Sequence, residues 1–434
     1  MIERTKNIFG NMQQELTIAL MPCGSLFEDF FDTIGVSFET LRNELTGGWM
    51  FNYIDALQLA GVQTVLVFVS ARVSETLQFT HKPTGAKVCI LPAPKLHRAF
   101  RHATRFAKFS KKAVFKSLDS YLILPLRQLA SELKLHGCDA ILFQDYENPS
   151  FDMSVLLGHL LGLSVFATFQ GGSGQRSLFE YPLRPLALHA CTGLIIATQT
   201  EIERVCSSYK VSPAKIARIF NPMDVTNWQA IDRIEARASL GISTEARVVV
   251  CHGRIDIAQK GLDILLDAWE QIICERPGQE LQLLLVGTGS DADVLCQRIA
   301  TMQLQSVLWV NEYVRDRMAI RRYLSAADVY TLPSRHEGFP VAPIEAMACG
   351  LPIVAANAPG VSDILEHGEA SGGLIVPSED KKALALALGR ILDNEAWGRE
   401  LGKRARQRVE ERFSLEVIGK QLREFISNRA LKSS

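Results

Sequence analysis

Short apolar runs alternate with amphipathic stretches along the chain, and this alternation predicts strands of a parallel sheet covered by helices. Near the start, residues 16–21 and 62–69 form two such runs. Between them, Ile54, Leu57 and Ala60 follow a helical period. A strand, a helix and a second strand in this order indicate the beginning of a doubly wound α/β domain.

The alternation continues through the rest of the sequence. In the first half, further strands are predicted at residues 140–143, 164–169 and 193–197. A β-branched run then opens a second series of strands, at residues 247–251, 281–286, 307–310 and 328–333. Because 434 residues exceed what one hydrophobic core usually holds, we expect two α/β domains.

Composition places the chain among ordinary globular proteins. Hydrophobic residues make up 47% of it and charged residues 22%, and 47 basic residues balance 47 acidic ones. A net charge of zero argues against a general polyanion binder, so no nucleic-acid partner is expected.

The cysteines and the N-terminal residues both indicate a cytoplasmic protein. Nine cysteines are scattered without a C-x-x-C pair, mostly among apolar residues. We interpret them as small core side chains in a reducing compartment, in preference to a disulfide framework or a zinc site. The first residues are polar and lack a signal-like apolar segment, and no apolar run reaches the ~18 residues of a membrane span.

The candidate functional residues cluster on one turn of the chain. A buried strand is predicted at residues 328–333 and a short helix at 344–348, so Glu337 falls between them and Glu345 on the helix. Backbone N–H groups at such a turn, beginning with those of Gly338 and Phe339 before Pro340, favour an anion such as phosphate. Carboxylates instead accept hydrogen bonds from hydroxyl groups. Phosphate and hydroxyls together suggest a nucleotide sugar.

The residues of this turn carry a family resemblance. Glu337 and Glu345, with seven residues between them, resemble the E-x7-E motif of the retaining family 4 glycosyltransferases, and the flanking Leu-Pro-Ser and Ala-Met-Ala-Cys-Gly-Leu-Pro sequences are also typical. Upstream, Gly253, Arg254 and Lys260 resemble the family's G-R-x-D-x-x-K-G diphosphate clamp, with a gap one residue longer. In isolation, this spacing would indicate ordinary surface charge.

The resemblance implies a GT-B fold, in which two Rossmann-like domains face a central cleft. Asn221 to Asp224 resemble the segment that closes the first domain in this family. We therefore expect an acceptor domain at residues 1–224 and a nucleotide-sugar domain at 225–414, with a final helix at 415–434 that returns to the first domain.

The resemblance also implies roles for individual residues. Arg254 and Lys260 would bind the diphosphate, Glu345 the ribose hydroxyls and Glu337 the sugar ring. Main-chain groups near Asn311 and Tyr313 would contact the base. The remaining implied donor contacts are Gly253, Gly338, Phe339, Pro340 and the pair Gly47 and Gly48, which could instead be a simple helix-start turn.

Several candidates lie in the first half. Gln170 stands where many family members have a His; it keeps a hydrogen bond but cannot carry charge. Gly171 and Gly172 follow it, as a flexible turn or as a loop around the sugar. Glu147 is a weak acceptor candidate. The ring- and carboxylate-rich insertion 22–46 is either a packing helix or an acceptor flap.

A basic amphipathic helix is predicted at residues 95–116. It carries eight Lys and Arg residues, with Leu96, Phe100 and Ala103 near helical spacing. Its basic face is either solvated or docks on an anionic membrane surface, where lipid-linked acceptors lie.

Together these features predict a retaining glycosyltransferase that moves a sugar from a nucleotide-diphosphate sugar to a glycan or lipid-linked acceptor. It works in the cytoplasm or at the cytoplasmic membrane face. No cofactor or metal is expected, because no Asp-x-Asp pair has a metal-site context. A nucleotide-sugar epimerase and a non-catalytic nucleotide-sugar-binding subunit remain alternatives, since a fold does not fix a function.

Overall fold

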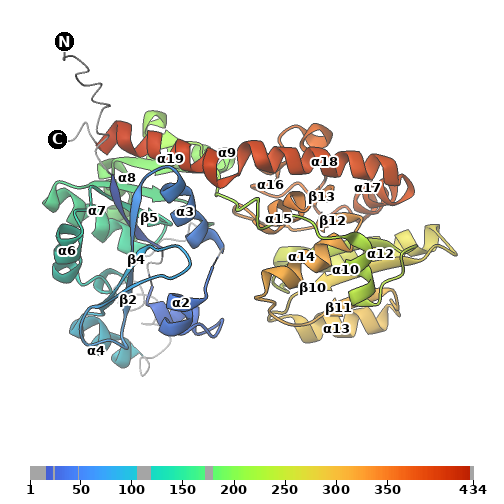
Figure 1. Cartoon of the computed structure of the whole chain (residues 1–434), viewed down its shortest axis with the longest axis horizontal. Coiled ribbons are helices and arrows are strands. Elements are labelled where there is room, and N and C mark those ends of the chain that lie inside the picture. Colours follow the sequence, from blue (N-terminus) through green and yellow to red (C-terminus); the bar gives the residue numbers. More distant parts are fainter. Residues whose placement is uncertain (1–15, 23–24, 47, 105–118, 172–178, 431–434) are drawn as a thin grey trace, which may run out of the picture.

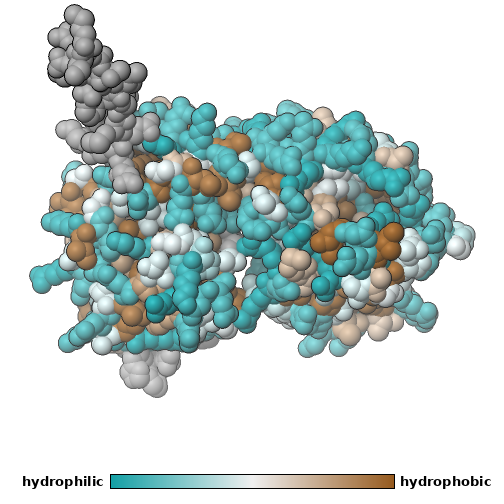
Figure 2. All heavy atoms as spheres, viewed as in Figure 1, coloured by the Kyte–Doolittle hydropathy of each residue, from teal (hydrophilic) through white to brown (hydrophobic). Residues whose placement is uncertain are grey.

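The computed structural model describes residues 16–22, 25–46, 48–104, 119–171 and 179–430. It shows two α/β domains side by side (Figure 1), which also appear as two lobes in the space-filling view (Figure 2). The first domain contains the strands from β1 to β8 and the second those from β9 to β14. The predicted pair of doubly wound α/β domains is therefore confirmed.

The first domain is built on an eight-stranded sheet in the order β3-β4-β2-β1-β5-β6-β7-β8. β3 pairs antiparallel with β4, and the remaining pairs are parallel. β5 and β6 are buried at every position, as expected of parallel strands covered on both faces. The strands are β1 (Thr17–Met21), β2 (Gln63–Ser70), β3 (Leu77–Thr80), β4 (Lys87–Pro92), β5 (Ala140–Gln144), β6 (Ser164–Thr168), β7 (Gly193–Ile195) and β8 (Ile216–Ala217).

Helices lie on both faces of this sheet (Figure 1). They are α1 (Phe27–Phe31), α2 (Phe38–Asn43), α3 (Gly48–Leu59), α4 (Lys95–Thr104), α6 (Leu126–Leu135), α7 (Pro149–Leu161), α8 (Glu180–Ala190), α9 (Gln199–Tyr209) and the 3-10 turn η2 (Pro213–Lys215). Helix α4 is the described part of the predicted basic helix; residues 105–116 of that prediction lie outside the described residues.

The insertion at residues 22–46 forms α1 and α2. Phe27 and Phe31 are buried, stack with their ring centroids 4.3 Å apart, and both meet the Phe68 ring edge-on. These two side chains therefore pack the insertion against β2. Phe30 remains 42% exposed, so one ring of the insertion is still available to solvent.

The second domain has a six-stranded, fully parallel sheet in the order β11-β10-β9-β12-β13-β14. The direction of winding reverses between β9 and β12, which makes this the switch point where doubly wound sheets bind ligands. The strands are β9 (Arg247–His252), β10 (Leu281–Val286), β11 (Val307–Val310), β12 (Val329–Leu332), β13 (Ile353–Ala356) and β14 (Gly373–Val376).

The helices of the second half cover this sheet and then return to the first domain. They are α10 (Arg233–Leu240), α11 (Ile257–Lys260), α12 (Leu262–Glu275), α13 (Ala292–Thr301), α14 (Arg317–Ser325), α15 (Ala342–Ala348), α16 (Val361–Ile364), η3 (Gly368–Ser371), α17 (Lys381–Asp393), α18 (Glu395–Arg412) and α19 (Leu415–Ala430). Among the described helices, none has both the length and the apolar character needed to cross a membrane.

Helix α19 fastens the end of the chain to the first domain. A Cβ atom added to Gly419 would lie 2.0 Å from the carbonyl oxygen of Ala56, so α19 and α3 approach each other at backbone distance. Farther along α19, Arg423 donates to the Ala60 carbonyl at 2.7 Å. The Phe425 ring packs against Phe166 of β6, with centroids 5.8 Å apart.

This contact makes Gly419 a specific test of the domain arrangement. An ordinary helical Gly→Ala change stabilises a helix by about 0.5–1 kcal/mol. Gly419→Ala should instead destabilise the protein by ~1–3 kcal/mol, because the new methyl group collides with α3. Chemical denaturation would measure the difference, with the exposed Lys420→Ala as the control on the same helix. A stabilising Gly419→Ala change would contradict the close packing of α19 on α3.

Candidate active site

Several of the candidate functional residues identified in the sequence lie together at the carboxyl ends of β9 and β12. His252 is the last residue of β9, Gly253 and Arg254 follow it, and Glu337 lies on the turn between β12 and α15. The backbone of Gly253 has φ +144°, a conformation that favours glycine. A Cβ atom on Gly287 would lie 1.9 Å from the Gly253 carbonyl oxygen, so the loops after β9 and β10 are in direct contact.

Glu337 is the buried charge of this site. Its side chain is 7% exposed, and its Oε1 atom accepts a hydrogen bond from Lys260 Nζ at 2.7 Å. Lys260 ends the short helix α11, whose N-terminus is capped by the Asp256 side chain. A buried carboxylate needs a cation or several donors, so this ion pair explains how Glu337 stays charged in the fold.

Glu345, the second carboxylate of the motif, is bound to a histidine. His252 Nε2 lies 2.9 Å from Glu345 Oε2. The imidazole ring also meets the Tyr330 ring edge-on, with centroids 5.4 Å apart, and the Tyr330 hydroxyl donates to the His252 carbonyl. Sequence reasoning did not select His252, although it directly precedes the Gly253-Arg254 pair.

Two buried polar atoms at these strand ends have no partner within the described part of the chain. They are His252 Nδ1 and Ser334 Oγ. A small cavity lies between these residues and is lined by Gly253, Arg254 and Lys260 as well. Unpaired buried polar atoms are uncommon, so both atoms mark a place where a polar ligand or water completes the site.

Arg254 and Lys260 do not converge in this structure. The Arg254 side chain is 62% exposed, and its guanidinium donates to Gln259 Oε1 at 2.6 Å. Gln259 in turn donates to the His336 carbonyl at 3.3 Å. Lys260 points to Glu337 instead, so the diphosphate clamp formed by these two cations stays a prediction.

Arg335 holds the Glu337 turn in place and was missed by sequence reasoning. Its guanidinium donates to both oxygens of Asp263 on α12, at 2.8 and 2.7 Å, and also binds Glu379. It donates to the Ile257 carbonyl of α11 at 3.1 Å as well. Hydrogen bonds to Asp263 and Glu379 raise the pKa of Arg335. Its position two residues before Glu337 is the sequence signal that could have identified Arg335 as part of this turn.

The first domain contributes a neutral amide network. Gln170 Nε2 donates to Thr168 Oγ1 at 3.0 Å, and Asn221 Nδ2 donates to Gln170 Oε1 at 3.3 Å. The Tyr53 hydroxyl of α3 donates to Asn221 Oδ1 at 2.9 Å, and burial raises the pKa of Tyr53. Because every described member of this network is uncharged at neutral pH, Gln170 has no charge or proton to offer a substrate.

The backbones of the two domains meet beside Gln170. A Cβ atom on Gly338 would lie 2.7 Å from the Cα atom of Gly171. The Phe339 ring stacks on the Phe220 ring at 5.5 Å, and Phe413 packs against both. Phe339 therefore packs the domains together through its ring. Its backbone N–H and that of Gly338 remain the expected anion contacts.

The remaining predicted residues are placed as follows. Glu147 lies in a buried ion network, where it binds Arg204 and Arg184 and accepts from the Tyr209 hydroxyl at 3.2 Å. These contacts give Glu147 a structural role and leave its acceptor role a prediction. Asn311 and Tyr313 are exposed after β11, Pro340 is buried, and Gly48 begins α3. Gly47 and Gly172 lie outside the described residues.

A second cavity, of about 430 Å³, lies on the first domain between α1, the end of β2 and α4. Arg98 of α4 donates to the carbonyl oxygens of Ala93 and Val73, at 3.0 and 2.6 Å. Arg101 of α4 binds both oxygens of Asp29 on α1. Arg98 and Arg101 belong to the basic face that was predicted to be solvated or to dock on a membrane. Both instead form hydrogen bonds or ion pairs within the first domain.

Comparison with known proteins supports this reading of the second domain. Residues 246–394 match the model of the family described as Glycosyl transferases group 1. A D-inositol 3-phosphate glycosyltransferase of Kineococcus radiotolerans is 29% identical over 51% of this chain and 54% of its own length. The chain thus spans about half the length of this curated relative.

Solved structures match the chain over almost its full length. A sucrose-phosphate synthase of Thermosynechococcus elongatus has a TM-score of 0.70 and 24% identity, and covers 96% of this chain and 100% of its own. Anabaena HepE, crystallised in complex with UDP, has a TM-score of 0.69 and 17% identity, with coverages of 95% and 100%. The GT-B fold expected from the sequence is confirmed.

The buried pair of Lys260 and Glu337 predicts a measurable coupling. Lys260→Met should lower the free energy of unfolding by ~2–3 kcal/mol, because Glu337 would be left without its counter-charge. Adding Glu337→Gln should recover at least ~1 kcal/mol relative to the sum of the two single changes. Denaturation of the single and double variants measures this energy.

The matched control is Lys381→Met, which removes a surface pair with Asp267. It should cost less than ~1 kcal/mol, because exposed ion pairs contribute little. Strictly additive effects at positions 260 and 337 would contradict an ion pair that acts as one unit.

Proposed function

We propose that the chain is a retaining glycosyltransferase that transfers a sugar from a nucleotide-diphosphate sugar to a hydroxyl group of a glycan or lipid-linked acceptor. The observation that carries the proposal is the switch point between β9 and β12. It presents two carboxylates, each held by a cationic or imidazole partner, and the buried Ser334 hydroxyl, which has no partner among the described residues. This arrangement lies within the segment that matches the glycosyltransferase family.

The donor would lie on the second domain. Breaking its anomeric bond leaves negative charge on the diphosphate, and stabilising that charge is the main catalytic demand. Lys260 and Arg254 would supply positive charge, while the Gly338 and Phe339 amides would donate hydrogen bonds. These groups would replace the cation that other transferases use, so transfer would require no metal.

Lys260 links the diphosphate to the sugar in this proposal. In the structure, its ammonium group is already paired with Glu337. An arriving diphosphate would share Lys260, since an ammonium has three donors, and Glu337 would keep a neighbouring cation while accepting from sugar hydroxyls. Glu337 would thereby orient the ring and support positive charge at the anomeric carbon.

The other donor contacts follow from position. Glu345 would bind the ribose hydroxyls, and main-chain groups near Asn311 and Tyr313 would contact the base. Gln170, adjacent to the Gly171–Gly338 contact, would donate to or accept from a sugar hydroxyl without taking a proton. Retention of configuration and the acceptor class rest on the sequence resemblance to family 4.

Donor binding and transfer test these roles. We expect one member of a panel of UDP-, GDP- and ADP-sugars to raise the melting temperature, because it binds the native state alone. Glu345→Gln should reduce that shift, and Glu337→Gln should reduce turnover more than binding. Arg254→Ala should lower transfer by ~100-fold, on the scale of losing one charge-stabilising donor.

The products of slow turnover without acceptor distinguish the competing functions. A transferase releases free nucleotide and sugar, an epimerase forms a new nucleotide sugar, and a binding subunit forms neither. The exposed Lys382→Ala serves as the control for nonspecific charge effects. Unchanged donor affinity and turnover in both glutamate variants would contradict the proposed site.

For the acceptor, we propose that the enzyme works at the cytoplasmic face of a membrane through the basic stretch 95–116. Leu96 of α4 is 61% exposed, which suits insertion among headgroups. Each Lys or Arg near an anionic leaflet contributes about 1 kcal/mol, so several suffice for reversible binding. Arg98 and Arg101 are engaged within the first domain, so the test uses other residues.

We expect the protein to co-sediment with vesicles containing anionic lipid at low salt and to dissociate at high salt. Replacing Lys108, Lys111 and Lys112 by Gln should weaken the binding. The same change at the exposed residues Lys382, Lys403 and Lys420 should not. No binding at low salt, or equal binding of both triple variants, would point to a soluble acceptor.

A further inference from the structure

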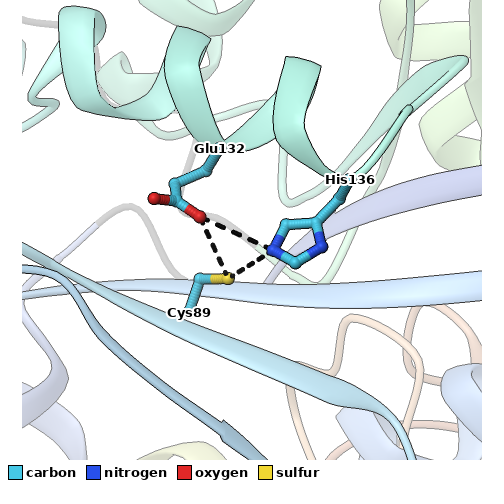
Figure 3. Close-up of side chains that lie close together, drawn as sticks. All are labelled: Cys89, Glu132 and His136. Carbon is cyan, nitrogen blue, oxygen red and sulfur yellow. Dashed lines mark hydrogen bonds and ion pairs between the residues drawn. The ribbon is translucent and has the colours of Figure 1, made fainter.

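A thiol, a carboxylate and an imidazole meet between β4 and α6 of the first domain (Figure 3). Cys89 projects from the middle of β4, Glu132 projects from α6, and His136, the residue that follows the end of α6, points toward both. Cys89 is fully buried, and the Glu132 and His136 side chains are 11% and 8% exposed. In Figure 1, α6 lies on the side of the first domain that faces away from the second.

The nitrogen–oxygen distance within this trio is long for a hydrogen bond, whereas the two contacts of the sulfur atom are weak thiol hydrogen bonds. Glu132 Oε2 lies 3.5 Å from His136 Nε2, beyond the usual range for an N–H···O bond of about 2.7–3.2 Å. Cys89 Sγ lies 3.8 Å from Glu132 Oε2 and 3.4 Å from His136 Nε2. A thiol has a single proton and is a weak donor, so it cannot satisfy both neighbours.

The same distances fit ligands that share one zinc ion. With Zn–S near 2.3 Å and Zn–N and Zn–O near 2.1 Å, the ligand atoms of a tetrahedral site lie about 3.3–3.6 Å apart. Two of the three separations fall in this range, and the third exceeds it by a small amount. All three ligand atoms point toward a common centre (Figure 3).

The chemistry and surroundings of the trio also suit zinc. Thiolate, imidazole and carboxylate form a mixed S, N and O set that zinc accepts, and a carboxylate and a histidine four residues apart share one helix face. Gln78, the register partner of Cys89 on β3, donates to Glu132 Oε2 at 2.6 Å. Such a bond orients a ligating carboxylate and increases the affinity of a metal site.

We propose that Cys89, Glu132 and His136 bind one Zn²⁺ ion, with a water molecule as the fourth ligand. Binding replaces the thiol proton, which leaves to solvent, by a Zn–S bond. The ion joins the middle of β4 to α6 and so stabilises the outer part of the first sheet. We assign the ion a stabilising role, because it would link β4 to α6 and because the trio shares no residue with the proposed donor site at the ends of β9 and β12.

The first test is the metal content of the full chain. Purified without chelator, the protein should contain about one zinc per molecule by mass spectrometry. Co²⁺ supplied in its place should give a thiolate-to-metal charge-transfer band, which reports directly on a Co–S bond. Cys89→Ser should abolish the band, and His136→Gln should abolish or strongly weaken it.

Two matched variants serve as controls. Cys191→Ser alters another buried thiol of the same domain, and His159→Gln alters an exposed histidine of α7. Both should retain the metal and the cobalt band. Gln78→Leu, which removes the bond to Glu132, should weaken zinc binding by about 10- to 100-fold.

A chelator separates this site from the cleft. EDTA should lower the melting temperature of the native protein, and Zn²⁺ should restore it, because the ion binds only the folded state. Donor-induced stabilisation and turnover, measured well below the melting temperature, should survive the chelator.

Absence of both the cobalt band and a zinc-dependent rise in melting temperature in the folded wild type would overturn the proposal. Equal zinc content in Cys89→Ser would overturn it as well. If the Cys89 variant fails to fold, the cobalt spectrum of the wild type decides. Loss of turnover with EDTA, restored by Mg²⁺ but not Zn²⁺, would count against the proposed cleft chemistry and leave the zinc site standing.

Discussion

The arrangement of the second domain depends on keeping a charged carboxylate buried at the end of β12. Glu337 is 7% exposed, and an isolated buried charge is strongly unfavourable. The fold must therefore place the ammonium group of Lys260 next to the Glu337 carboxylate. This placement requires the end of α11 to pack closely against the turn that follows β12. The glycine after Lys260 makes this possible: Gly261 has φ +63°, and a Cβ atom there would lie 2.1 Å from the Pro333 carbonyl oxygen. Arg335 then ties the turn to α11 and α12 from the other side.

The same turn also fixes how the two domains meet. Gly338 presses against Gly171 of the first domain, and a Cβ atom on Gly360 would lie 2.2 Å from the Gly338 carbonyl oxygen. Beyond it, the buried Asp363 carboxylate accepts from Arg218 and from the Gln199 backbone, both of the first domain. Glu337, which would contact the sugar, therefore lies next to the contact between the two domains. The backbone of Gln170 consequently lies near Gly338, the residue that follows Glu337.

The strands, the two domains and the position of Glu337 could be predicted from the sequence, because hydrophobic periodicity and glycine positions are local signals. The partners of the charged residues could not. Lys260 was expected to face a diphosphate and is paired with Glu337, 77 positions away. Glu147 looked available for an acceptor but is bound by Arg184 and Arg204. Pairings of this kind depend on which helices the sheet brings together, and residue spacing does not encode them.

The contact between His252 and Glu345 orients the Glu345 carboxylate but involves only one of its two oxygens. His252 Nδ1 is buried without a partner among the described residues, and an unpaired acceptor there is less costly than an unpaired N–H. A proton on Nε2 that is donated to Oε2 of Glu345 agrees with this geometry. Within the described part of the chain, Oε1 of Glu345 has no such contact. The carboxylate is thus held in one orientation by His252. Oε1 is the oxygen that would bind the ribose hydroxyls in the proposed function.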